Sequence, residues 1–278
     1  MKQTRITKYI IYGKLYFISI SLSFRASSLV GRFNGSKIFL NSIPKSGTHL
    51  LSRTLMYLPT LRYSVEKTLI VGKQKEQSIL DRIAKIRPGE FILGHIKNNK
   101  KVFHLMQEKS IRSIMLIRDP RQIVISHYKY VTYIEVTHYS HHFFKNLKDD
   151  NERLLAVING VENKVESIDK ILDSYSDWLT NSDTLVVKYE DLIGEKGGGR
   201  YSAQIDVLNK ISSFLGIKIN ENEIKKLTES IFSTDSPTFR SGRIDSWRGE
   251  LSNEHKELLK QKVGAWLIRY GYEKDLNW

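Results

Sequence analysis

The sequence contains no cysteine, so it forms no disulfide and supplies neither a thiolate nucleophile nor a cysteine-ligated zinc site. A reducing compartment is the simpler expectation for such a chain. Acidic residues are absent before Glu66. Long apolar runs are also missing near the start, where the charge-free stretch Leu15–Phe24 is shorter than the ~20 residues that a membrane-spanning helix needs.

Basic residues are abundant instead, and the formal net charge is +14. The imbalance is strongest in the acid-free part of the chain. It indicates an anionic partner such as a nucleotide, a nucleic acid, a membrane surface or an acidic glycan. At 278 residues with 40% hydrophobic content, the chain is long enough to bury a full core.

The N-terminal segment 1–36 combines basic and aromatic residues. Lys2, Arg5 and Lys8 precede the apolar stretch, which is typical of a signal peptide and also of a segment that rests on an anionic membrane. We expect peripheral membrane contact through residues 1–30 or none at all. The predicted location is cytoplasmic, with membrane-peripheral attachment as the variant of that prediction.

The stretch Lys37–Leu51 organises the rest of the chain. An apolar run breaks at Pro44 and Gly47 and then resumes at helical spacing, which predicts a buried strand, a tight turn and a helix. The first amides of such a helix lack partners and, beside the Lys45 ammonium, suit a phosphate-like anion. It is not a nucleotide triphosphate loop of the Gly-x-x-x-x-Gly-Lys-Ser/Thr type, because Lys45 precedes the only glycine.

Strands and helices alternate along the chain. Apolar runs that begin at Lys37 and span 90–96, 113–117 and 184–189 predict strands, and residues 120–130, 165–179, 205–215, 221–230 and 254–270 predict helices. This alternation predicts an α/β fold, a three-layer α/β/α arrangement with a central, mostly parallel sheet and P-loop-like nucleotide-binding architecture. We expect one domain over 37–278, a loop and a variable helix over 59–80, and a mobile lid near 132–160.

Further candidate residues stand at the predicted strand ends. His95 ends the second strand. Arg118 ends the third, and Ser126 follows eight positions later in a helix that Pro120 would open. Downstream, Arg240 and Gly242 form a glycine-bearing loop suited to a second anion.

These motifs together resemble the sulfotransferases that use 3′-phosphoadenosine-5′-phosphosulfate (PAPS). Pro44–Thr48 (PKSGT) resembles their 5′-phosphosulfate loop, and Arg118–Arg121 (RDPR) with Ser126 resembles their 3′-phosphate motif. His95 stands where the family's catalytic histidine ends the second strand. Val187–Leu192 (VKYEDL) and the closing loop Phe239–Trp247 are also similar, so the likeness runs from about residue 37 to 250.

The resemblance implies roles for individual residues. The 5′-phosphosulfate would be held by Lys45, Ser46, Gly47 and Thr48, with His49 beside them, and the 3′-phosphate by Arg118, Ser126, Arg240, Ser241 and Gly242. Ser230 and Phe232 look like the adenine contacts, and Tyr189 is either a nucleotide contact or structural. His95 would be the catalytic base, and Lys45 would counter charge on the leaving phosphate oxygen.

The implied reaction moves a sulfuryl group from PAPS to a hydroxyl or amine by in-line displacement, and it leaves 3′-phosphoadenosine-5′-phosphate (PAP). The resemblance implies no metal, and His138, His141 and His142 are interpreted as part of a solvated lid because no carboxylate joins them at useful spacing. We expect a small-molecule, glycan or lipid acceptor and no nucleic-acid partner. The oligomeric state stays open.

Two departures from the family pattern matter. The adenine-stacking tryptophan of the family's loop is absent, since the chain reads Gly47–Leu50 (GTHL) there. Leu93–His95 (LGH) replaces the Lys-Thr-His of well-known animal members, so a second catalytic lysine is in doubt, although Lys97 stands close by in sequence. The alternatives are a P-loop-type kinase or NTPase, which would need Mg²⁺, and a non-catalytic nucleotide- or polyanion-binding protein.

Overall fold

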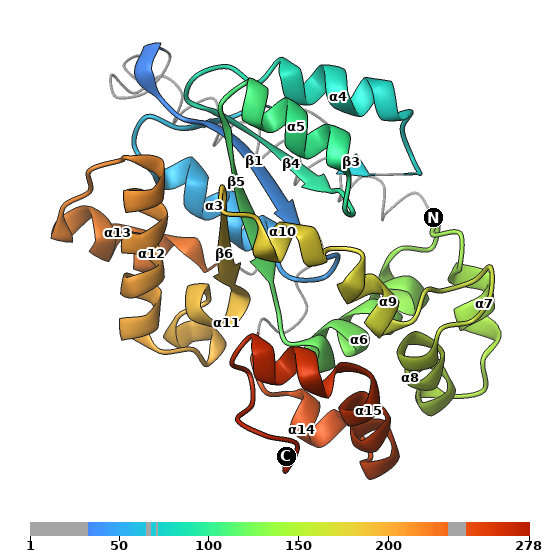
Figure 1. The fold of residues 1–278 in the computed structure, drawn as a ribbon. Coiled ribbons are helices and arrows are strands. Elements are labelled where there is room, and N and C mark those ends of the chain that lie inside the picture. Colours follow the sequence, from blue (N-terminus) through green and yellow to red (C-terminus); the bar gives the residue numbers. More distant parts are fainter. Residues whose placement is uncertain (1–32, 65–67, 71, 233–242) are drawn as a thin grey trace. The chain divides into compact units, whose positions relative to one another are not determined.

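The computed structural model describes residues 33–64, 68–70, 72–232 and 243–278. The chain divides into two compact units. The first comprises the described residues of Met1–Ile117 and Asp177–Gly242, and the second comprises Arg118–Ser176 and Arg243–Trp278. Figure 1 labels most of the helices and strands.

The first unit is built on a six-stranded sheet in which every strand pair is parallel. The main path runs β2-β4-β1-β5-β6, and β3 also pairs with β4. The strands are β1 (Lys37–Ser42), β2 (Arg62–Tyr63), β3 (Leu69–Ile70), β4 (Glu90–His95), β5 (Ile111–Ile117) and β6 (Thr184–Lys188). Because β1 lies between β4 and β5, the carboxyl ends of these three strands meet at one edge.

Helices cover both faces of this sheet (Figure 1). Alternate strand residues such as Leu40 and Leu116 share one core with α3 (Thr48–Tyr57), α12 (Tyr201–Leu215) and α13 (Glu221–Ile231). On the other face Phe39 packs against Trp178, which in turn contacts Phe103. These two aromatic residues come from α10 (Ser176–Thr180) and α5 (Lys100–Glu108). The predicted three-layer α/β/α arrangement with a parallel sheet is therefore confirmed.

Three shorter elements complete the first unit. They are α4 (Glu76–Ala84), α11 (Tyr189–Leu192) and a 3₁₀ turn (Glu195–Gly197).

The second unit is helical. Its elements are α6 (Pro120–Lys129), a π-helical turn (Tyr130–Ile134), α7 (His141–Asn146), α8 (Asp150–Asn159), α9 (Ile168–Asp173), α14 (Trp247–Glu250) and α15 (Asn253–Arg269). Proline opens α6 as expected, and the Asp119 carboxylate caps the helix by accepting from the Arg121 amide at 2.8 Å. The segment predicted to be a lid forms α7 and α8, and its mobility stays a prediction.

Two element predictions were wrong. The expected helix over 165–179 is interrupted between α9 and α10, where the Ser174 hydroxyl donates to the Ile171 carbonyl at 2.7 Å and so competes with helical bonding. In the segment 59–80 the expected helix is present as the start of α4, but the expected loop contains β2 and β3, which are too short to give a period-two pattern.

Several predictions fall on residues 1–32 and 233–242, which lie outside the described part of the chain. They concern the membrane contact of residues 1–30 and the roles of Arg240, Ser241 and Gly242. Within the described ranges, no helix combines the length and the apolar character needed to cross a bilayer.

Candidate functional site

The turn between β1 and α3 has an unusual backbone. Lys45 adopts φ 73° and Gly47 φ 94°, so two residues in four lie in the left-handed region. This conformation costs a non-glycine residue free energy, and such strain collects at functional sites. Alternating left-handed residues also turn successive amides toward one point, which is the geometry of an anion-binding nest.

One buried hydroxyl and three backbone amides of this turn lack partners among the residues that the structure describes. Ser46 is fully buried, and its hydroxyl makes no hydrogen bond with any described residue. The amide hydrogens of Gly47, Thr48 and His49 also find no acceptor in the described part of the chain, as expected at a helix start. A buried hydroxyl without a partner costs about 1–3 kcal/mol, so the turn is suited to a ligand with acceptor oxygens.

Gly47 is required by its contacts as well as by its backbone. A Cβ atom there would lie 2.4 Å from the ring of Tyr189, which is buried at the end of β6. Tyr189 therefore packs directly against the turn. This contact agrees with its structural interpretation, and a nucleotide contact remains a prediction.

His95 is tied to the same turn by hydrogen bonds. Its Nδ1 lies 2.8 Å from the Ser42 carbonyl oxygen and 3.2 Å from the Ser42 hydroxyl. The Ser42 hydroxyl is also 2.7 Å from that of Thr48. A carbonyl only accepts, so Nδ1 carries the hydrogen and Nε2 keeps its lone pair. The arrangement holds His95 as a proton acceptor.

The electrostatics keep this imidazole neutral. Burial lowers the pKa of His95 below 6.5, the Ser42 carbonyl opposes that shift, and the positive charges of Lys45 and Lys73 lower the pKa further. Burial likewise lowers the pKa of His49 to about 4, with contributions from Lys45 and His95. Both histidines are uncharged near pH 7, which a general base requires.

Sequence reasoning missed two residues near His95. Asn41 is fully buried and bonds both backbone groups of Ile96, accepting from its amide at 2.9 Å and donating to its carbonyl at 2.8 Å. It thereby fixes the chain directly after His95. Lys73 follows β3, whose Ile70 pairs with His95 in the sheet. Neither belongs to a motif, although a lone asparagine inside an apolar strand run is a signal for Asn41.

The packing explains why Gly94 precedes His95. A Cβ atom at Gly94 would lie 2.4 Å from the ring of Phe39, so the ring fills the space that a side chain would take. The backbone carbonyl of Lys97 accepts from the Trp178 indole at 3.4 Å, in the same aromatic cluster. The suggestion that Lys97 assists catalysis stays untested.

In the second unit, Arg118 and Arg121 flank the start of α6. Arg118 is buried directly after β5, and Ser126 lies two turns into the helix. Arg121 bonds Asp119 through Nε at 2.9 Å and Nη2 at 2.7 Å, and Glu273 through Nη1 at 2.5 Å. Arg121 is thus committed to protein carboxylates.

Gln122 ties the downstream chain to α6. With its amide oxygen toward the backbone, it accepts from the amides of Ser246 at 2.7 Å and Trp247 at 2.9 Å. Gln122 and Ser126 are one turn apart, so they share a face of α6. The residues just after the predicted Arg240–Gly242 site are therefore held on the helix that carries Ser126.

A family model described as a sulfotransferase domain matches residues 35–271. The chain belongs to the sulfotransferase family. The predictions of this family and of a sulfotransferase enzyme are confirmed by a match that covers most of the chain. No curated protein matches the chain significantly.

Solved structures share the sulfotransferase fold at low sequence identity. The mouse sulfotransferase SULT7A1 complexed with PAP is 18% identical with a TM-score of 0.60, and the match covers 91% of this chain and 95% of that one. Retinol dehydratase in complex with retinol and PAP is 14% identical with a TM-score of 0.53, covering 84% and 82%. Another structure of retinol dehydratase, with androsterone and PAP, is 14% identical with a TM-score of 0.52, and the match covers 83% of this chain and 80% of that one.

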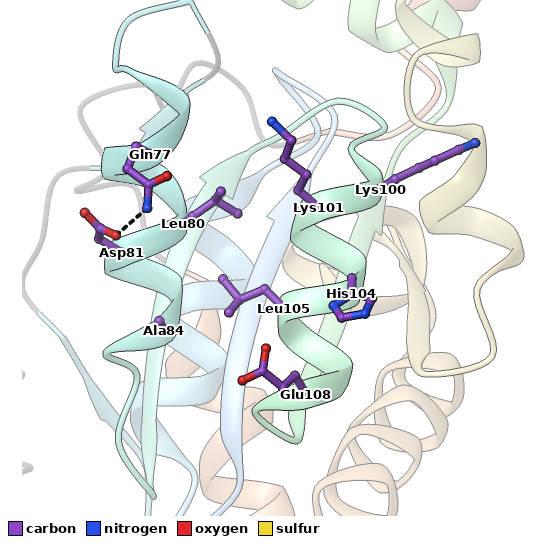
Figure 2. A pocket seen from close by; sticks show the side chains of 9 residues that line it. All are labelled: Gln77, Leu80, Asp81, Ala84, Lys100, Lys101, His104, Leu105 and Glu108. Atoms are coloured by element: carbon purple, nitrogen blue, oxygen red, sulfur yellow. Dashed lines mark hydrogen bonds between the residues drawn. The ribbon is translucent and has the colours of Figure 1, made fainter.

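The sulfotransferase also has an open hollow of about 490 Å³ between α4 and α5 (Figure 2). Leu80 and Leu105 point into it, and polar residues such as Lys101 and His104 lie along it. None of the predicted site residues lines this hollow. Among the described residues no group of three or more histidine, aspartate or glutamate side chains is arranged to hold a metal.

The adenine contacts expected from the sequence lie in the first unit. Ser230 stands near the end of α13 and Phe232 directly follows that helix. The apolar side of α13 packs in the same core as α3, the helix that begins after the Lys45–Gly47 turn. Their contact with adenine stays a prediction.

Proposed function

We propose that this sulfotransferase transfers the sulfuryl group of PAPS to a hydroxyl or amine of its acceptor, with His95 as the base. The observation that carries the proposal is the turn after β1, where a buried Ser46 hydroxyl and helix-start amides lack partners among the described residues. A neutral imidazole is bonded to the same turn through Ser42. The mouse sulfotransferase SULT7A1 and retinol dehydratase share the fold and were both solved with PAP, which supports this choice of donor.

The first unit would hold the 5′ end of the donor. The amides of Gly47, Thr48 and His49 and the Ser46 hydroxyl are donors suited to phosphate and sulfate oxygens. The Lys45 ammonium would counter the charge that develops on the phosphate oxygen as it leaves. This chemistry needs positioning and charge stabilisation more than covalent help from the protein.

The second unit would supply the contacts to the 3′-phosphate. Arg118 and Ser126 come from the start of α6, and the proposal also includes Arg240, Ser241 and Gly242. Gln122 anchors the chain that follows those three residues onto α6, which supports their joint use. A guanidinium is the side chain best matched to a phosphate dianion.

His95 would act on the acceptor. As the acceptor oxygen or nitrogen bonds to sulfur and the bond from sulfur to the bridging phosphate oxygen breaks, the acceptor proton passes to Nε2 of His95. Nδ1 keeps its hydrogen on the Ser42 carbonyl throughout. A positioned base of this kind contributes typically ~10²–10⁴-fold.

The acceptor class is proposed only broadly, as a small molecule, glycan or lipid. Structures of retinol dehydratase contain retinol or androsterone, so a protein of this fold accommodates small apolar molecules. A cytoplasmic location, with or without membrane contact through residues 1–30, also stays a prediction.

The test is transfer of labelled sulfate from PAPS to fractionated cell extract. We expect a labelled product that forms without added Mg²⁺ and disappears with a His95→Ala variant. An exposed histidine on α5 offers the matched control, since His104→Ala should leave transfer intact. Absence of labelled product with every fraction, or transfer that survives loss of His95, would contradict the proposal.

A further inference from the structure

Arg121 has an enclosed environment that none of the predicted roles uses. Its side chain is only 2% exposed, and it lies between the carboxylates of Asp119 and Glu273. Two indoles complete the enclosure, because the guanidinium carbon lies 3.8 Å from the ring centre of Trp247 and 4.3 Å from that of Trp278. The two rings are nearly perpendicular, at 86°.

Two of these four partners come from the segment that follows α15. This segment is fixed on α15, where the Tyr272 amide donates to the Leu267 carbonyl at 2.8 Å. Leu276 packs so closely on Gly264 that a Cβ atom there would lie 2.5 Å from its Cδ2. Glu273 and Trp278 therefore contact Arg121 from a segment that is bonded to and packed on α15.

Asp119 links this cluster to the start of α6. One of its carboxylate oxygens, Oδ1, caps the helix through the Arg121 amide and also accepts from the Arg121 side chain. The residue just before it is Arg118. Any loosening of the Asp119–Arg121 pair therefore changes the direction in which the chain leaves Arg118 and enters α6.

We propose that Glu273 and Trp278 position Arg118 and Ser126 for the 3′-phosphate, acting through Arg121. The inference rests on the proposed function, because it assigns this segment to the donor site. Arg121 is a positioning residue here: Nε and both Nη nitrogens each bond a carboxylate. The two indoles exclude water from these ion pairs and thereby strengthen them.

The experiment is calorimetric titration of the full chain with PAP and with AMP, which lacks the 3′-phosphate. We expect Trp278→Ala to weaken PAP binding by roughly tenfold, about the effect of one partly desolvated cation–π contact, and to leave AMP binding nearly unchanged. Trp278→Phe should restore most of the PAP affinity. The exposed Lys274 of the same segment is the control, since Lys274→Ala should leave the affinities for both PAP and AMP unchanged.

If Trp278→Ala acted only through a general loss of stability, the affinities for PAP and for AMP would fall by the same factor. That result overturns the inference. Unchanged PAP affinity in Trp278→Ala also overturns it. Should Trp278→Ala fail to fold, Glu273→Gln decides by the same PAP-to-AMP ratio, because it keeps the side-chain shape. Failure of the proposed function is recognised separately, since the wild-type chain would then show no preference for PAP over AMP.

Discussion

Two short basic motifs each follow a buried strand: the turn Lys45–Thr48 after β1 in the first unit, and the residues Arg118–Arg121 at the start of α6 in the second unit. They differ in how their polar groups are satisfied. The turn presents a buried Ser46 hydroxyl and helix-start amides without partners among the described residues. At α6, in contrast, Arg121 is bonded to two carboxylates and covered by two indoles.

Basic side chains in such motifs can serve a ligand or the scaffold. The hydrogen-bond partners in the structure distinguish these two uses, whereas the sequence motif does not. A polar group that the fold buries without a partner is costly, so it points to a ligand. A guanidinium paired on all sides points to the scaffold. Four substitutions or measurements test the roles assigned to the two motifs and to the residues around them, beginning with the largest expected effect.

Replacing His95 by alanine should reduce turnover by about 10²–10⁴-fold, the typical contribution of a general base. PAP affinity should change little, because in the proposed reaction Nε2 takes the proton of the acceptor and makes no contact with PAP. Single-turnover kinetics with PAPS, together with calorimetric PAP titration, separate the two quantities. A parallel loss of PAP binding would mean that His95 binds the donor and would contradict its role as the base.

Arg121→Met should lower the free energy of unfolding by about 3–5 kcal/mol, because it leaves the buried Asp119 carboxylate and the half-buried Glu273 carboxylate without their partner. Arg118→Met is the matched variant. We expect it to change the free energy of PAP binding more than the free energy of unfolding. Chemical denaturation and calorimetry on both variants measure this difference. If the two arginines behave alike in both assays, the division between ligand-binding and structural cations is wrong.

Gly94→Ala should destabilise the first unit by about 1–3 kcal/mol, because the new methyl group would overlap the Phe39 ring. The matched control is Gly249→Ala, where a Cβ atom meets nothing within 4 Å. Urea denaturation measures both. Equal stability of the two variants would mean that Phe39 moves aside freely and does not fix the strand end before His95.

The pH dependence should show the smallest effect. Burial, Lys45 and Lys73 lower the pKa of His95 below 6.5, so the base is still mostly neutral at pH 6.5. Activity is lost only as the pH falls through the lowered pKa. A profile of kcat/KM against pH should therefore remain above half of its maximum at pH 6.5. An acid limb centred above pH 6.5 would contradict the neutral environment described for His95.

The sequence supported the prediction of the sheet and of the strand ends that carry Lys45, His95 and Arg118, because apolar runs and turn residues specify these locally. The periodicity predicted one continuous helix over 165–179, but the structure interrupts it, since the Ser174 hydroxyl competes with the backbone there. Contacts between residues far apart in the sequence could not be predicted either. Nothing in the local pattern shows that Phe39 occupies the space at Gly94, or that Trp278 covers Arg121.

The central claim is that the chain recognises a nucleotide phosphorylated at both ends, with Lys45–Thr48 at one end and Arg118 with Ser126 at the other. Calorimetric titration of the wild-type chain with PAP and AMP tests it most directly. The account predicts at least about tenfold tighter binding of PAP, because each charge-assisted hydrogen bond to the 3′-phosphate contributes roughly 1.5–3 kcal/mol. Equal affinity for PAP and AMP would contradict it.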